Sequence, residues 1–212
     1  MAPFMISQCS VPDGAALAAN NVPAFWADPH WVLAWRHRTL EYHISQVALL
    51  FPRNMLNERE SFRHQKAVNL ETGRILGYAR WSLYVPSCHE INPDNGTPIW
   101  PEAQVPAFEP EKEAEIRWIA ETAIWDPNED ADELGNRVTA LRTEVTPKTP
   151  HISLKYLAVH PDNQRKGVGT ALVKSGTDQA DKMGLDIIGV SGEYGADFFI
   201  YEAGSRTVST CT

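Results

Sequence analysis

The stretch from residue 157 to residue 170 contains residue types that bind phosphate groups. It reads LAVHPDNQRKGVGT. Gly167 and Gly169 let a bulky phosphate approach the backbone, where a Cβ atom would collide with it. Arg165 and Lys166 place positive charge beside these glycines. If a helix begins here, its first turn adds backbone N–H donors and the positive end of the helix dipole. The pattern therefore predicts a phosphate or pyrophosphate site.

The segments on either side of this loop have the patterns of a strand and a helix. The sequence predicts a strand over 151–161 and a helix over 167–183. The apolar residues that share one face of this helix are Val168, Leu172, Ala180 and Met183. Gly184 is its expected C-terminal cap, and the Ile- and Val-rich stretch 185–190 predicts another strand. A strand, a glycine-bearing loop and a helix in succession indicate an α/β architecture.

The loop matches neither of two common phosphate-binding patterns, because it lacks GxxxxGK[ST] and GxGxxG. It resembles motif A of the GNAT N-acetyltransferase superfamily, (Q/R)xxGx(G/A), with Gln164, Gly167 and Gly169 at the motif positions. The L-x-V-x-P pattern that usually precedes the motif is formed by Leu157, Val159 and Pro161. The alternative interpretation is an ordinary strand–loop–helix turn. The resemblance is detailed over 151–190 and loose over 1–84.

The resemblance implies acetyl-coenzyme A as co-substrate and no metal. The pantetheine arm would lie along the backbone of Leu157, Ala158 and Val159 like an added strand, beside a separation of neighbouring strands. A backbone N–H there, of Val159 or Leu157, would polarise the thioester carbonyl. The pyrophosphate would be held by the loop and the first helical residues, namely Gln164, Arg165, Lys166, Gly167, Val168, Gly169 and Thr170.

The resemblance also implies a general acid for the thiolate leaving group, often a tyrosine late in the chain. The stretch FFIYEAG over 198–204 is the nearest match to the family pattern. It places Tyr201 at the acid position in one register and Phe199 in the other. Because the glycine of this stretch comes one residue early and no GF pair follows, the usual last strands of the family's sheet are in doubt.

A general base is harder to identify. Period-2 alternation along the strand would place His151, Ser153, Lys155 and Leu157 on one face. His151 is a candidate base by its ordinary pKa, with a surface histidine at the strand end as the alternative. Further candidates are Glu115 and Glu121, whereas His160 is interpreted as a turn residue.

The remaining sequence predicts the other elements of such a fold. Residues 5–9 predict a first strand, followed by a small helix with Asp13 as its N-cap. His30 to Phe51 predicts one or two helices, which Pro52 would stop or bend. Residues 67–84 predict a β-hairpin with Gly73 in its turn. Two amphipathic helices are expected around 116–123 and 134–145. The fold class is therefore α/β (α+β), with a mixed, largely antiparallel central sheet flanked by helices.

These predictions group into one GNAT-like domain over 1–212. Residues 1–86 form its N-terminal strand, helices and hairpin, and 87–150 form an acidic helical insertion. The acetyl-CoA-binding core covers 151–190, and 191–212 is an irregular tail. Several aromatic residues are candidates for an acceptor pocket: Phe25, Trp26, Trp31, Trp35, Tyr78 and Trp81. Trp81 is favoured, because it lies on the hairpin strand that faces the acceptor in similar proteins.

Charge and composition indicate which kinds of partner and location the protein has. The net charge of −8 argues against nucleic acid as a partner, and no apolar run is long enough for a membrane span. Fourteen acids and five bases fall within 90–150, either as a solvated surface or as a wall that attracts a cationic amine. Three widely spaced cysteines and the lack of a recognisable secretory leader favour a cytoplasmic location.

We therefore expect an N-acetyltransferase that acetylates a small amine or a polyamine-like acceptor by direct attack in a ternary complex. The alternatives are a non-catalytic acyl-CoA-binding module and a GNAT-like domain that uses another acyl donor or an alcohol. The sequence leaves the oligomeric state open, with a homodimer among the options.

Overall fold

The computed structural model describes residues 3–85, 99–128, 136, 139–140, 143, 148–191 and 208–210. Its centre is a sheet whose six strands follow chain order from one edge to the other. They are β1 (Phe4–Gln8), β2 (Phe62–Asn69), β3 (Ile75–Tyr84), β4 (His151–Val159), β5 (Asp186–Ser191) and β6 (Val208–Thr210). The first four strands pair antiparallel, whereas β4–β5 and β5–β6 pair parallel. The predicted mixed, largely antiparallel sheet is confirmed.

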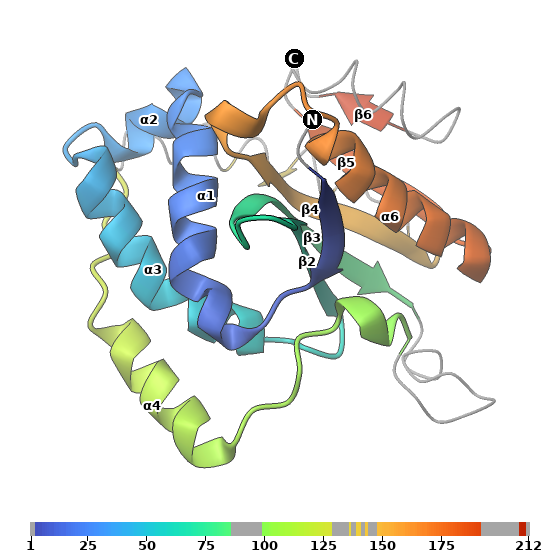
Figure 1. Ribbon diagram of the computed structural model, residues 1–212, viewed down its shortest axis with the longest axis horizontal. Coiled ribbons are helices and arrows are strands. Elements are labelled where there is room, and N and C mark those ends of the chain that lie inside the picture. Colours follow the sequence, from blue (N-terminus) through green and yellow to red (C-terminus); the bar gives the residue numbers. More distant parts are fainter. Residues whose placement is uncertain are drawn as a thin grey trace.

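Helices cover both faces of this sheet (Figure 1). The α-helices are α1 (Gly14–Trp26), α2 (Pro29–Trp35), α3 (Leu40–Leu56), α4 (Pro110–Glu121) and α6 (Val168–Met183). The described residues also form three short 3₁₀ helices, η1 (Val11–Asp13), η3 (Pro101–Ala103) and η5 (Pro161–Asn163). On one face, α1 packs on β3 and α3 packs on α1, while α6 packs on the other face. Both faces of β3 are therefore covered, as its apolar sequence predicts.

The hairpin between β2 and β3 forms where the sequence predicts it. Gly73 has φ 70°, which a residue with a Cβ rarely adopts. The side-chain oxygen of Asn69 accepts hydrogen bonds from the backbone N–H groups of Glu71 and Thr72, at 2.9 and 2.8 Å. These bonds close the turn locally, so the hairpin can set the register between the two strands.

Asp13 stands at the expected N-cap position of α1 but without a side-chain cap, and Pro52 lies inside α3 rather than at its end. The Asp13 side chain does not cap α1; its carboxylate accepts from the Ser10 backbone N–H at 2.7 Å and from Lys66 Nζ at 2.6 Å. Pro52 does not stop α3, which continues to Leu56. A Cβ on Gly14 would lie 2.7 Å from the Pro52 ring, so glycine lets the start of α1 approach the proline directly.

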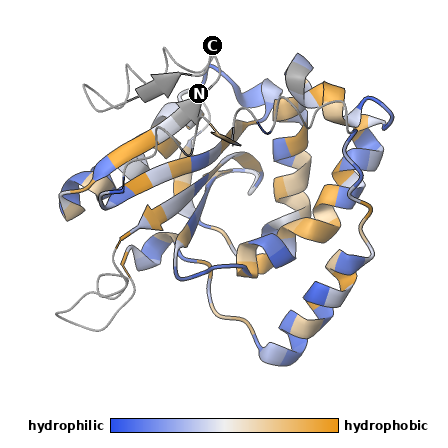
Figure 2. Ribbon diagram, turned by 180° about the vertical axis from the view of Figure 1, so that it is seen from behind, coloured by the Kyte–Doolittle hydropathy of each residue, from blue (hydrophilic) through white to orange (hydrophobic). Residues whose placement is uncertain are grey.

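Helix α4 accounts for much of the acidic segment that the structure describes. Its carboxylates lie mainly in solvent, and Glu113 pairs with Arg117 one turn later. Figure 2 shows hydrophilic and hydrophobic residues interspersed along α4 and α6, as in helices that bury one face. Most of the helix expected around 134–145 lies outside the described residues. In the described ranges, no helix is both long and apolar enough to cross a membrane.

Candidate active site

Strand β4 separates from β5 halfway along its length. The two strands pair from His151↔Asp186 to Leu154↔Gly189. Beyond Leu154, β4 continues to Val159 with β3 as its partner. Within the described residues, the edge of 155–159 that faces away from β3 has no strand beside it. An extended chain added there can form backbone hydrogen bonds with this edge.

A bulge lies at the point of separation. Arg80 of β3 is opposite Tyr156 of β4, but the next residue, Trp81, is opposite Leu154. One extra residue, Lys155, therefore shifts the alternation of side chains along β4. Ile152 and Leu154 before the bulge, and Leu157 and Val159 after it, all pack in the core cluster that includes α6 residues. The expectation that Leu157 shares a face with His151 and Ser153 was wrong, because uninterrupted period-2 alternation cannot include a bulge.

Beyond β4, the chain passes through η5 and a tight loop into α6. Gln164 Nε2 donates to the Val159 carbonyl at 3.3 Å, and Lys166 Nζ donates to the Asp162 carbonyl at 2.6 Å. Arg165 and Gly167 have φ 58° and 74°, and Gly167 is the N-cap of α6. The predicted loop residues are thus brought together where β4 ends and α6 begins.

A glycine in β3 lets the first turns of α6 lie directly on the sheet. A Cβ at Gly77 would lie 2.8 Å from Val168 Cγ1, 3.1 Å from Leu172 Cδ1 and 3.2 Å from the Ala158 carbonyl oxygen. Because these separations are shorter than van der Waals contact, any larger residue would push α6 from β3 and β4. The position of the helix N-terminus beside β4 therefore depends on Gly77.

The opposite face of the sheet contains a pocket of about 390 Å³. Its walls come from α1, α2, α3 and strands β2 to β4, and from Ala120, Glu121, Ala123 and Trp125 at and beyond the end of α4. The aromatic lining residues are Trp31, Phe51, Tyr78, Trp125 and Tyr156. Tyr156 lies on β4 within the open edge and directly before Leu157, so the pocket and the candidate donor segment meet at this strand. The volume suits a small molecule.

Three polar side chains from neighbouring strands lie in this pocket. His64, Arg80 and Tyr156 are cross-strand neighbours on β2, β3 and β4. His64 Nδ1 lies 2.8 Å from the Tyr78 hydroxyl. Burial, with the nearby charges of Arg80 and Arg63, lowers the pKa of His64 to about 3. His64 is therefore neutral near pH 7 and adds no charge to the pocket.

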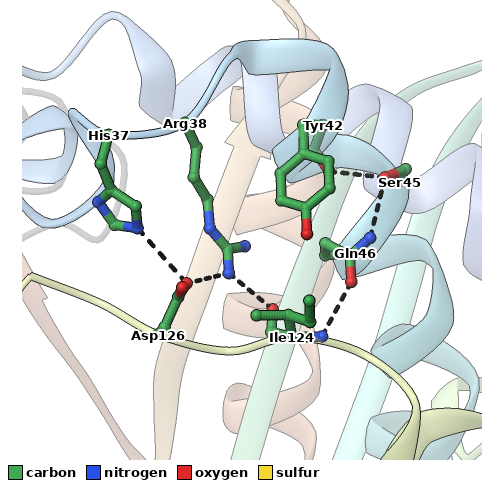
Figure 3. A network of polar contacts seen from close by, with 7 residues as sticks. All are labelled: His37, Arg38, Tyr42, Ser45, Gln46, Ile124 and Asp126. Atoms are coloured by element: carbon green, nitrogen blue, oxygen red, sulfur yellow. Dashed lines mark hydrogen bonds and ion pairs between the residues drawn. The ribbon is translucent and has the colours of Figure 1, made fainter.

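Residues 120–126 are tethered to α3 and the turn before it (Figure 3). Gln46 Oε1 accepts from the Ile124 backbone N–H at 2.8 Å. Arg38 Nη2 donates to the Ile124 carbonyl at 3.0 Å and also binds the Asp126 carboxylate. His37 Nε2 lies 3.4 Å from the same carboxylate. These contacts attach the part of the acidic segment that lines the pocket, which we call the roof (residues 120–126).

The histidine candidates lie away from the pocket lining. His151 is buried, which contradicts the surface alternative; its Nδ1 lies 2.7 Å from the Thr149 carbonyl and its ring stacks on Tyr84. It is six strand residues from Leu157, roughly 20 Å at about 3.3 Å per residue. His160 is confirmed as a turn residue, since its side chain accepts from the Asp162 backbone N–H.

The two carboxylate candidates for the general base differ in their position relative to the pocket. Glu115 is exposed on α4 and does not line the pocket, whereas Glu121 does. Glu121 is the only carboxylate among the described lining residues. The candidate acid Tyr201 and its alternative Phe199 lie outside the described residues. Within the described ranges, no cluster of three or more histidine, cysteine or acidic side chains is placed to hold a metal ion.

Trp81 lies in the core rather than in the pocket lining. It is fully buried, its Nε1 donates to Gln65 Oε1 at 3.1 Å, and its ring lies against Gly176 of α6. This is the face of the sheet opposite to Tyr78 and Arg80. Of the six aromatic candidates named from the sequence, Trp31 and Tyr78 line the pocket.

Comparison with known proteins identifies the class to which this fold and site belong. The family model described as "Acetyltransferase (GNAT) family" matches residues 30–195. The chain therefore belongs to the GNAT acetyltransferase family. No curated protein gives a significant match.

Solved structures share the fold at low sequence identity. A tetramutant of BH1408 protein from Bacillus halodurans has a TM-score of 0.51 and 12% identity, covering 98% of this chain and 97% of that one. A ribosomal-protein-alanine N-acetyltransferase from Brucella melitensis has a TM-score of 0.48 and 12% identity, with coverages of 99% and 97%. The aminoglycoside N-acetyltransferase AAC(6')-Iy in complex with CoA has a TM-score of 0.48 and 9% identity, with coverages of 100% and 93%.

Several pocket residues were missed by sequence reasoning. Arg53, His64 and Arg80 come from α3, β2 and β3 and meet only in the folded chain. One signal was available at Arg80, a lone charge within the otherwise apolar stretch GYARW of a central strand. A buried charged residue in such a strand needs a partner. Arg53 and His64 carry no comparable signal.

Proposed function

We propose that this protein transfers the acetyl group of acetyl-CoA to the amine of a small acceptor. The observation that carries the proposal is the separation of β4 from β5 beyond Leu154, directly before the glycine-bearing loop and α6. Membership of the GNAT family supports the same reaction class. The pocket at Tyr156 supplies room for an acceptor on the other face of the same strand.

In this proposal the donor binds mainly through the backbone. The pantetheine arm pairs with the open edge of Leu157, Ala158 and Val159, as an added strand would. The pyrophosphate lies at the start of α6, where the first N–H groups of the helix point outward and the helix dipole is positive. Gly167 keeps this approach clear, since no atom lies within 4 Å of the position its Cβ would occupy.

The chemistry is a direct acyl transfer. The acceptor amine, once neutral, attacks the thioester carbonyl carbon, and a backbone N–H of β4 stabilises the developing oxyanion. The C–S bond then breaks, the thiolate takes up a proton, and the new amide nitrogen loses one. Because an alkylamine has a pKa near 10, its ammonium form must first release a proton. Glu121, directly or through water, is our candidate acceptor for that proton.

Tyr201 stays our candidate for the acid that protonates the thiolate, with Phe199 as the alternative occupant of that position. Tyr201→Phe should lower turnover by about 10²- to 10⁴-fold if the hydroxyl supplies this proton. The affinity for acetyl-CoA should stay unchanged, because the hydroxyl acts only as the thiolate forms. Steady-state kinetics with a titration of acetyl-CoA binding checks both. An unchanged rate would remove Tyr201 from the mechanism.

A single assay tests the proposed function. The protein is incubated with acetyl-CoA and a panel of amines, and free thiol is followed, with a reaction lacking amine as the hydrolysis blank. Amine-dependent thiol release, with the acetylated amine identified by mass spectrometry, is expected. Binding of acetyl-CoA without turnover across the panel would favour a non-catalytic acyl-CoA-binding module. Absence of acetyl-CoA binding would refute both.

A further inference from the structure

The charged residues of the pocket favour an acceptor that carries an anionic group. Arg53 and Arg80 contribute two positive charges, and Glu121 contributes one negative charge, so the described lining has one net positive charge. His64 adds none, because burial and the neighbouring arginines lower its pKa to about 3. This balance differs from that of the acidic segment, whose carboxylates on α4 lie mostly in solvent.

Buried donors in the pocket lack acceptors. Trp31 Nε1, Arg53 Nε and Arg80 Nε are enclosed, and none has a hydrogen-bond partner among the described residues. A buried donor without a partner is costly, so native structures supply one from protein, solvent or ligand. Three residues that line one cavity each carry such a donor, which fits a ligand with several acceptor oxygens.

Two aromatic rings hold the guanidinium of Arg80 in place. Its guanidinium lies 5.3 Å from the Phe62 ring centroid and 5.9 Å from that of Tyr156. It forms no ion pair with any described residue, in contrast to Arg38, which binds Asp126. These contacts limit the movement of the guanidinium, and its planar fork suits a carboxylate. Arg53 is committed only in part, because its Nη2 donates to the adjacent Asn54 Oδ1 at 3.2 Å.

We propose that the acceptor is an amino acid or a related amino carboxylate with an apolar or aromatic side chain. Its carboxylate binds Arg80 and Arg53, and its side chain packs against the aromatic wall that includes Trp31 and Trp125. A singly charged carboxylate matches the single net positive charge of the lining better than a phosphate dianion does. This inference rests on the proposed function and names the substrate class for the same site.

The test compares acceptors that differ only at the carboxyl group: phenylalanine, phenylalaninamide and phenethylamine. Spermidine and phosphoethanolamine represent the polycationic and phosphate classes. We expect kcat/KM for phenylalanine to exceed that for the two analogues that lack the carboxylate by about 10- to 100-fold, the range for a charge-assisted hydrogen-bonded pair. Equal or faster reaction of either analogue, of spermidine or of phosphoethanolamine would overturn the proposal.

Substitutions of Arg80 test whether this residue causes the preference for phenylalanine. Arg80→Gln should lower kcat/KM for phenylalanine by about 10- to 100-fold, with phenethylamine little changed, and Arg80→Lys should restore part of the loss. Arg74→Gln, at an exposed arginine of the same hairpin, is the matched control and should leave both acceptors unaffected. An equal loss for phenylalanine and phenethylamine in Arg80→Gln would contradict carboxylate recognition.

A binding measurement separates failure of this inference from failure of the proposed function. Phenylalanine and phenethylamine are titrated by calorimetry into the protein saturated with CoA, where no turnover occurs. Tighter binding of phenylalanine, lost in Arg80→Gln, supports the inference even if no amine is acetylated. Binding of phenylalanine no tighter than that of phenethylamine overturns it, even if amines are acetylated.

Discussion

The two faces of the sheet differ in what they offer a ligand. On the α6 side, Gly77 and Gly176 let side chains of α6 and the Trp81 ring approach closely, and Gly167 leaves open space at the start of α6. On the α1 and α3 side, aromatic and arginine side chains surround a cavity of about 390 Å³. In the proposed function, the first face presents backbone groups to the acetyl donor, which is the same molecule in every turnover. The second presents side chains, which can discriminate between acceptors.

Because of this difference, substitutions on the two faces should have different effects on binding. Changes on the α6 face should affect donor binding and the packing of α6, whereas changes around the pocket should affect only the acceptor. Strand β4 belongs to both faces, because Leu157 packs toward α6 and Tyr156 lines the pocket. The following four predictions test how independent the two faces are.

The largest effect is expected from Gly167→Trp, which should weaken CoA binding by about 100-fold or more by filling the path of the pyrophosphate. Gly73→Trp is a matched control, because Gly73 has a similar φ, 70° against 74°, and equally open surroundings. Both variants carry the backbone cost of positive φ, about 1–2 kcal/mol. Calorimetric titration with CoA measures the difference. Equal affinity of the two variants would refute a pyrophosphate site at Gly167.

The next effect concerns stability. Alanine normally stabilises a helix interior relative to glycine by about 1 kcal/mol. At Gly176, however, its Cβ would lie 2.3 Å from the Trp81 ring. We therefore expect Gly176→Ala to lower the free energy of unfolding by about 1–3 kcal/mol through overpacking.

Chemical denaturation measures this change. Combining Gly176→Ala with Trp81→Leu should make the alanine less harmful than it is alone, because the ring it meets has been removed. A more stable Gly176→Ala single variant would contradict the tight packing of α6 on Trp81.

A smaller effect is expected from the roof. Gln46→Ala removes the acceptor of the Ile124 N–H, while the Arg38 contacts remain. Loss of one such bond costs about 1 kcal/mol, so kcat/KM for the acceptor should fall by about 3- to 10-fold. Gln8→Ala, at an exposed glutamine of β1, is the control. A change in CoA affinity of similar size would argue against the independence of the two faces.

The smallest effect is expected from pH. His64 has an ordinary pKa of 6.5 when unfolded and about 3 when folded, because burial disfavours its charged form. Between these values the unfolded chain binds more protons, so stability falls as pH decreases from about 6.5 toward 3. His64→Gln should reduce this loss by about 1 kcal/mol between pH 6.5 and 5.5.

Denaturation midpoints at several pH values measure the slope, with His160→Gln as the control. Some slope should persist in His64→Gln, because burial also lowers the pKa of His43 to about 4. An identical slope in the His64 variant and the unsubstituted protein would show that His64 is already accessible to protons in the folded state.

The sequence predicts the α6 face better than the pocket, for a physical reason. The loop at Gln164–Thr170 is local, so its glycines, cations and flanking periodicity can all be read from adjacent residues. The pocket brings together α3, β2, β3 and the roof, and nothing in the local pattern of Arg53 or His64 specifies that they meet. Trp81 shows why local patterns are insufficient. Its residue type suited a pocket, but its ring packs against Gly176 of α6, far along the chain, and therefore lies in the core.

The bulge in β4 was also beyond local prediction, since an extra residue in a strand leaves no periodic signature until its partner strand is known. At Pro52 and Asp13 the sequence signals were genuine but were overridden. Helix α3 continues past the proline for one more turn, and Lys66, far along the chain, takes up the carboxylate that would otherwise cap α1.

The single extra residue at Lys155 has a consequence for engineering the protein. Before it, Ile152 and Leu154 point toward α6; after it, the odd-numbered Leu157 and Val159 do so. In the proposed binding mode, adjacent codons beyond the bulge therefore encode residues that face different ligands. A library varied at Tyr156 together with Arg80 and Trp125 could change the accepted amine, while Leu157 and Val159, left constant, preserve the handling of the acetyl donor.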